Sequence, residues 1–357
     1  METAIQSGTQ RLRSLIFSGI AVVVVFAALG IIKITGSSYV ERIAIGLGIN
    51  VILVVGLNLS NGYTGLFSLG HIGFMALGAY TSSILTLPLS MKGVNLPDLP
   101  LWLANVQMSF FPAALIGAFV AMIVAFFIGL SLMRLSGPYV SVATLGFLVI
   151  VQVILTNWDS FTRGARTFSG IPNYTTIWNV WAWAIVTVYF VWRIGKSSFG
   201  RKMMAARDNK IAAQSLGINI IRSRLLAFCL SAFFTGIAGA LWAHFIMAFS
   251  PKSFYFAQTF TVATMLIVGG LGSVSGSVIG VFTITILSEF LRNAERGFSL
   301  GFFEVPPLYG SSQVIMAVLF ILVIVLRPQG LSLGKEINFI KIYDHLRIKF
   351  LNKRRSD

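Results

Sequence analysis

The sequence predicts an all-α polytopic integral membrane protein with about ten transmembrane helices. Of its 357 residues, 56% are hydrophobic and 11% are charged, whereas soluble domains have roughly 45–50% and about 25%. The mean hydropathy is +0.84. The apolar residues also gather in long runs, and about 20 such residues cross the hydrocarbon core of a bilayer. These observations exclude a small soluble domain, and a single cysteine excludes an internal disulfide.

The predicted spans follow one another along the chain with short polar connections. They are Leu15–Ile34, Tyr39–Asn58, Leu69–Leu87, Phe111–Met133, Tyr139–Asn157, Ile177–Trp192, Leu225–Ala248, Ser273–Leu291 and Val314–Leu326. A further stretch, Ala257–Leu271, is shorter and contains Gly269 and Gly270. If that stretch enters and leaves on one side, the chain has about eight crossings plus re-entrant segments.

Basic residues predict the orientation. The chain carries 27 Lys and Arg against 11 Asp and Glu, and they cluster between spans and in the tail, as the positive-inside rule expects. Arg11 and Arg13 precede the first span and the tail is basic, so both termini are expected in the cytoplasm and the number of crossings is even. Ten crossings leave only Lys33, Arg42, Lys92, Arg163, Arg166, Lys252, Arg292 and Arg296 outside. The charge therefore indicates orientation and no nucleic-acid partner.

The expected organisation has three parts. Residues 1–14 form a cytoplasmic N-terminal segment, residues 15–330 a transmembrane domain with a cytoplasmic loop at 193–224, and residues 331–357 a basic cytoplasmic tail. The first apolar run exceeds the 7–15 residues of a signal peptide's apolar region. We therefore expect an uncleaved first span.

Few residues could carry chemistry. The histidines His71, His244 and His345 and the single Cys229 have no metal-ligand spacing, so no metal or cofactor is expected. Among the acidic residues, Glu41 lies at the end of a predicted span, and Glu289 lies inside one, about one turn from its end. A proton relay needs carboxylates at membrane depth, so an ion-coupled carrier or channel is a weaker alternative. An intramembrane enzyme is disfavoured because the spans hold no paired His, Asp or Glu constellation.

Two glycine-rich segments interrupt the apolar runs, one beginning at Asn61 and the other at Gly269. Non-helical backbone at membrane depth survives only when it is buried or lines a watery cavity, so these breaks are candidates for the translocation path. The candidate residues are Asn61, Gly62, Gly65, Ser68, Gly70, His71, Gly269, Gly270, Gly272 and Ser273.

Small residues at helical spacing predict close packing between helices. Gly272, Gly276 and Gly280 repeat every four residues and are expected on one helix face, and Ala232, Gly236 and Ala240 form a second such face. Ordinary close packing explains these two helix faces, in contrast to the two glycine-rich breaks.

Residues 199–217 predict a polar-faced helix in the cytoplasm that ends at Gly217. Met203, Met204, Ile211 and Leu216 alternate there with charged and polar residues. Such a helix either lies on lipid headgroups or docks into a cytoplasmic partner.

The segment Ile211–Gly217 resembles the coupling loop of bacterial ABC importer permeases. Residues 205–219 are similar, more specifically, to the LivM-type branched-chain amino acid permease family. Further blocks match in order along residues 40–330: Tyr63–Tyr80, Arg134–Tyr139 with Thr144–Phe147, Ser169–Pro172 and Gly269–Ser273. The family motif has Glu where this chain has Ile211, so no salt-bridge role is carried over.

This resemblance implies a permease subunit of an ABC importer in the bacterial cytoplasmic (inner) membrane, translocating leucine, isoleucine or valine. The chain would not be an enzyme, because partner subunits hydrolyse ATP. The implied partners are a homologous second permease, two ATPase subunits and a periplasmic or extracellular substrate-binding protein, docked on the external loops 90–110 and 158–176. The implied ATPase-coupling residues are Arg207, Asp208, Ile211, Ala212, Ala213, Leu216 and Gly217. A permease of the same family for urea, short amides or other amino acids is the nearest alternative.

Overall fold

The computed structural model describes residues 23–295, 298–299, 304–305, 310–327, 329–332, 334 and 336. The predicted N-terminal segment 1–14, the start of the first predicted span and most of the basic tail lie outside the described residues. The chain divides into two compact units. One comprises Met1–Ala44 with Glu336–Asp357, and its described part contains the apolar helix Val23–Thr35. The other is Ile45–Lys335, which holds every candidate site residue.

Six described helices are long and apolar enough to cross a membrane. They are α2 (Ser38–Thr64), α6 (Phe110–Leu132), α7 (Pro138–Asn157), α9 (Ile177–Lys196), α12 (Ile220–Ile246) and α14 (Val274–Ala294). Three other apolar helices are shorter: α3 (His71–Thr86), α13 (Phe256–Gly269) and α15 (Ser311–Leu326). This arrangement agrees with a polytopic α-helical membrane protein, and the count of about ten crossings stays a prediction.

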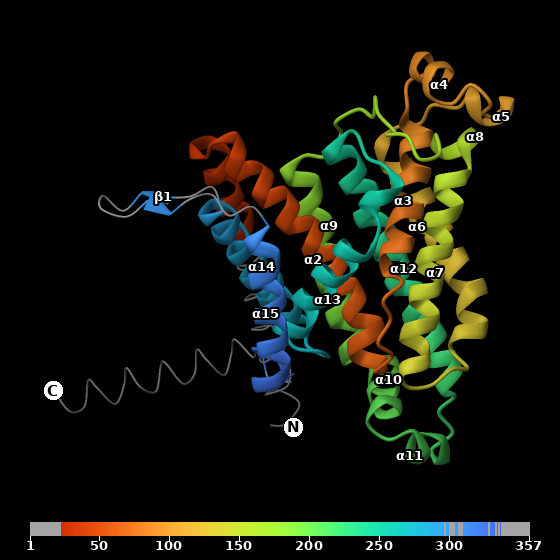
Figure 1. Cartoon of the computed structure of the whole chain (residues 1–357). Coiled ribbons are helices and arrows are strands. Elements are labelled where there is room, and N and C mark those ends of the chain that lie inside the picture. The colour runs from red at the N-terminus through yellow and green to blue at the C-terminus, as the bar shows by residue number, and fades with distance from the viewer. Residues whose placement is uncertain are drawn as a thin grey trace, which may run out of the picture. The chain divides into compact units, whose positions relative to one another are not determined.

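The connecting segments contain short elements at both ends of the long helices. These are α4 (Leu89–Asn95), α5 (Leu101–Ala104), α8 (Asp159–Thr162), α10 (Ser198–Asp208), α11 (Lys210–Ser215), the 3-10 helix η1 (Pro251–Ser253) and the antiparallel strands β1 (Phe298–Ser299) and β2 (Glu304–Val305). Figure 1 shows α4, α5 and α8 at one end of α3, α6, α7 and α12, and α10 and α11 at the opposite end.

Helices α3, α6 and α12 pack against one another along their lengths (Figure 1). Glycines make this approach possible: a Cβ added at Gly78 of α3 would lie 2.6 Å from the Cα of Gly236 in α12. A Cβ at Gly117 of α6 would lie 2.8 Å from the carbonyl oxygen of Gly78. The predicted small-residue face around Gly236 is therefore confirmed, and Ala232 and Ala240 beside it are fully buried.

A second close contact joins α13 to α14. A Cβ at Gly276 would lie 2.8 Å from the carbonyl oxygen of Gly269, and one at Gly280 would lie 2.7 Å from its Cα. The expectation that Gly272 shares this helix face is wrong. Gly272 precedes α14 and has φ +84°, a conformation that favours glycine.

Gly78→Ala tests the packing of α3 on α12. The added methyl overpacks the interface, so we expect a lower unfolding temperature in detergent, corresponding to about 1–3 kcal/mol. Gly146→Ala in α7 is the matched control, because nothing lies within 4 Å of its added Cβ. Equal unfolding temperatures for the two variants would contradict the tight packing.

Candidate functional site

The first glycine-rich segment breaks the helical backbone at residues 65–70, which we call the first break. The sequence predicted an interruption from Asn61, and this is wrong: α2 continues through Asn61 and Gly62 to Thr64. Buried tertiary contacts outweigh the low helix propensity of Asn and Gly. The turn out of the helix occurs at Gly65, where φ is +66°.

Side chains satisfy the backbone of the first break. The Asn61 carboxamide donates through Nδ2 to the Ser68 carbonyl and accepts from the Ser68 N–H, both at 3.1 Å. From α7, Thr144 Oγ1 accepts from the Leu69 N–H at 3.0 Å, and Ser141 Oγ donates to the Phe67 carbonyl at 2.6 Å. These bonds replace the helical ones that a break at membrane depth loses.

The histidine that begins α3 is held by the same segment. Ser68 Oγ lies 3.0 Å from His71 Nδ1, and both side chains are buried. The Gly70 N–H points to Ser68 Oγ at 3.5 Å. The Ser68 hydroxyl is thus free to donate to Nδ1, which favours the tautomer with the proton on Nε2.

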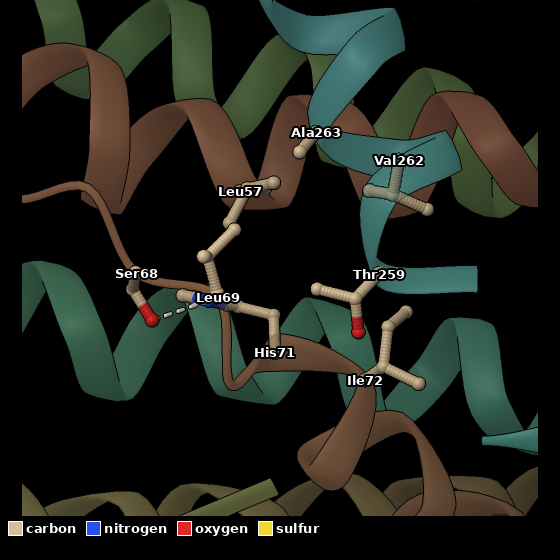
Figure 2. Close-up of a pocket in the computed structure, with 8 residues that line it drawn as sticks. All are labelled: Leu57, Ser68, Leu69, His71, Ile72, Thr259, Val262 and Ala263. Carbon is tan, nitrogen blue, oxygen red and sulfur yellow. Dashed lines mark hydrogen bonds between the residues drawn. The ribbon is translucent and has the colours of Figure 1, made fainter. Parts of the chain in front are cut away.

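A small cavity lies between the first break, α2 and α13, as Figure 2 shows. Its lining is mostly aliphatic, with polar side chains from Ser68, His71 and Thr259. The aliphatic residues are Leu57, Leu69, Ile72, Val262 and Ala263. Its accessible volume of about 10 Å³ has room for about one water molecule. The cavity is too small for a molecule as large as an amino acid.

The second break spans residues 270–273, between α13 and α14. Gly270 and Gly272 have positive φ of +114° and +84°, and Ser273 caps α14 by accepting from the Gly276 N–H at 3.0 Å. The Gly272 N–H donates to Asn58 Oδ1 of α2 at 2.8 Å. The two predicted breaks therefore meet at the end of α2, whereas Gly269 lies inside α13.

The predicted cytoplasmic helix is two helices, so the expectation of one continuous helix over 199–217 is wrong. Asn209 separates α10 from α11 and caps α11, because its Oδ1 accepts from the N–H groups of Ile211 and Ala212 at 3.1 Å each. An Asn side chain competes with the helical backbone in this way. Asp208, the last residue of α10, pairs with Arg207 at 2.9 Å.

Gly217 caps the C-terminal end of α11, as predicted. Its φ of +76°, with the bonds Gly217 N–H to Gln214 O at 2.9 Å and Ile218 N–H to Ala213 O at 3.0 Å, forms a Schellman motif. Ala213 is buried with Ala206 and Ile220, while Ala212 is exposed. Ile211 and Leu216 are each 78% exposed. The helix pair α10–α11 thus anchors one face and presents two large apolar side chains on the other.

The site includes residues that the sequence did not single out as candidates. Asn58, Ser141 and Thr144 bond the two breaks, and Thr259 lines the cavity. In the sequence these are polar residues inside apolar spans. Such a residue indicates an internal contact, but the sequence does not identify its partner. In the described part of the chain, no group of three or more His, Cys, Asp or Glu could hold a metal ion.

Comparison with known families identifies the family of the chain. Residues 39–326 match the family described as "Branched-chain amino acid transport system / permease component". The chain belongs to this permease family. The match spans both breaks and the helix pair α10–α11 of the permease.

Curated relatives agree with the family. The permease is 28% identical to the high-affinity branched-chain amino acid transport system permease protein LivM of Escherichia coli K12, over 79% of this chain and 67% of the relative. It is 27% identical to LivM of Salmonella typhimurium with the same coverage. The autoinducer 2 import system permease protein LsrC of E. coli O9:H4 is 25% identical over 48% of this chain and 53% of its own length. No solved structure matches the permease significantly.

Asn61→Ala tests how the first break is held. The change removes two buried hydrogen bonds, about 0.5–1.5 kcal/mol each. We expect amide hydrogen exchange of residues 65–70 to become roughly tenfold faster or more. Asn157→Ala is the control, because the Asn157 amide donates to the Val153 carbonyl of its own helix, away from the first break. Unchanged exchange at residues 65–70 would show that Asn61 does not hold the break.

Proposed function

We propose that the permease is the membrane subunit of a bacterial ABC importer for leucine, isoleucine and valine, in the cytoplasmic (inner) membrane. The observation that carries the proposal is helix α11, whose Ile211 and Leu216 side chains are exposed beside the buried Ala213. Large apolar side chains on a short polar-flanked helix suit a protein partner that covers them. The substrate class rests on the relatives named LivM.

The basic loop 193–224 lies at one end of the long helices and indicates their orientation. The end with α10 and α11 carries the basic loop 193–224, and the end with α4, α5 and α8 lies opposite (Figure 1). By the positive-inside rule, α11 faces the cytoplasm and α4, α5 and α8 face outward. Both termini are then cytoplasmic, with the predicted transmembrane domain at 15–330 and the basic tail at 331–357.

The external loops are braced for docking a substrate-binding protein. Lys92 of α4 is 2% exposed, and its ammonium donates to the carbonyls of Leu103, at 2.9 Å, and of Val106. Burial lowers the pKa of this Lys92 group. Asn95 Nδ2 donates to the Ser169 carbonyl at 3.0 Å, which ties the two external loops together. A rigid outer surface loses little conformational entropy on binding.

The path would run along the two breaks. Aliphatic side chains with Ser68, His71 and Thr259 line the cavity between the first break and α13, which suits an apolar side chain carried on a polar backbone. Energy would come from two ATPase subunits, with a homologous second permease completing the core. Glu289, the acidic residue inside α14, is paired with Arg292 of the same helix, an arrangement suited to an interfacial ion pair rather than a proton relay.

Replacing Ile211 and Leu216 by Asp tests the docking surface. We expect the ATPase subunits to be lost when the complex is purified through the permease, because two charges would replace the apolar contact. The control Ile211→Leu keeps the apolar area and should retain them. Undiminished co-purification of ATPase subunits with the double variant would contradict ATPase docking at α11.

Substrate competition in proteoliposomes tests the substrate class. The complex reconstituted with its binding protein should take up radiolabelled leucine when ATP is enclosed, and excess isoleucine or valine should suppress the uptake. Urea, a short amide or another amino acid serves as the competing alternative. Preferential uptake of urea over leucine would replace the proposed substrate with that of the nearest rival.

A further inference from the structure

One side chain connects the helix pair α10–α11 to both breaks. Arg207, next to the last residue of α10, reaches across to α2, and its Nη1 donates to the Gly62 carbonyl at 2.8 Å. The carbonyls of the last helical turn have no partner within the helix, and they carry the negative end of the helix dipole. A guanidinium there satisfies a buried acceptor with a favourable charge.

The stem of the same side chain packs against the turn of the first break. A Cβ added at Gly65 would lie 2.6 Å from Arg207 Cγ. Gly65 therefore serves two purposes, because its φ of +66° and the absence of a side chain are both needed. Movement of Arg207 along α2 would push directly on this turn.

The head of the side chain also adjoins the second break. A Cβ at Gly272 would lie 2.6 Å from Arg207 Nη1. Gly272 in turn donates its N–H to Asn58 Oδ1 of α2. The end of α2, the first break and the second break thus meet around one guanidinium group.

A second contact fixes the plane of the guanidinium. Arg207 Nε donates to Asp208 Oδ1 at 2.9 Å, in a pair whose side chains are 33% and 66% exposed. An exposed ion pair adds little stability. It does orient the planar fork, which presents its donors in fixed directions. Arg is thus suited to this position in a way that Lys, with a single flexible ammonium, is not.

We propose that Arg207 is the positioning residue that transmits movement of α11 to both breaks together. When a partner displaces α10–α11, the Arg207 contacts pull the end of α2 and the two glycine turns as one unit. This inference rests on the proposed function, since it assumes that an ATPase moves α11. The Ile211 and Leu216 docking surface does not itself reach the two breaks, and this inference assigns that connection to Arg207.

The test separates transport from ATP hydrolysis. Arg207→Gln is measured in the complete reconstituted complex, with leucine uptake and ATP hydrolysis recorded in the same vesicles. We expect uptake to fall about ten- to hundredfold, the factor for losing a hydrogen bond to a charged group. Hydrolysis should stay near the wild-type rate, so the ATP consumed per leucine rises. For Arg207→Lys, leucine uptake should lie between the wild-type and Arg207→Gln values, because lysine keeps the charge but loses the Nε donor.

Lys202→Gln is the matched control, since Lys202 is an exposed cation on the same helix. It should leave the ATP consumed per leucine unchanged. A wild-type rate of leucine uptake and a wild-type amount of ATP consumed per leucine in Arg207→Gln would overturn the proposal. Parallel losses of uptake and hydrolysis would also overturn it, because they would place Arg207 in docking alone. If Arg207→Gln does not assemble, Arg207→Lys carries the same comparison.

The outcome for the wild-type complex keeps the two proposals distinct. A wild-type complex without ATP-driven leucine uptake would contradict the proposed function. Wild-type uptake together with normal coupling in Arg207→Gln would contradict only the role of Arg207.

Discussion

The structure depends on one constraint: backbone that leaves the helical state inside a membrane must find every hydrogen bond within the protein. The first break meets it with the carboxamide of Asn61 and the hydroxyls of Ser141 and Thr144. The second meets it with Asn58. Each partner comes from a long helix, so the breaks are fixed by the helices that surround them.

Glycine contributes in a different way, by allowing helices to pack closely. A side chain at Gly78 of α3 would collide with the α12 backbone at Gly236, and one at Gly236 would collide with the α6 backbone at Ala118. Close approach provides the dispersion contacts that hold membrane helices together without a hydrophobic driving force. The core of α3, α6 and α12 can therefore stay rigid while shorter helices such as α13 adjoin the cavity at the first break.

The spans were predictable because an apolar run is a local property of the sequence. The run Phe111–Met133 differs from α6 by one residue at each end, and Tyr139–Asn157 differs from α7 by one residue at its start. The ends of the breaks were not predictable, since Asn61 and Gly62 are weak helix formers that tertiary contacts keep helical. The bond from Gly272 to Asn58 joins residues 214 positions apart. No local pattern specifies such a partner.

Arg207 illustrates the same division between local and distant information. Its place beside Asp208 in a basic loop could be read from the sequence, whereas its bond to the Gly62 carbonyl, 145 positions away, could not. The glycines at 65 and 272 could be seen in the sequence, yet the room they leave is for Arg207, whose stem lies beside Gly65 and whose guanidinium lies beside Gly272. Glycines in the two breaks can thus accommodate a side chain from a segment that is distant in the sequence. In this permease, the two breaks and the helix pair proposed to move them meet at one arginine side chain.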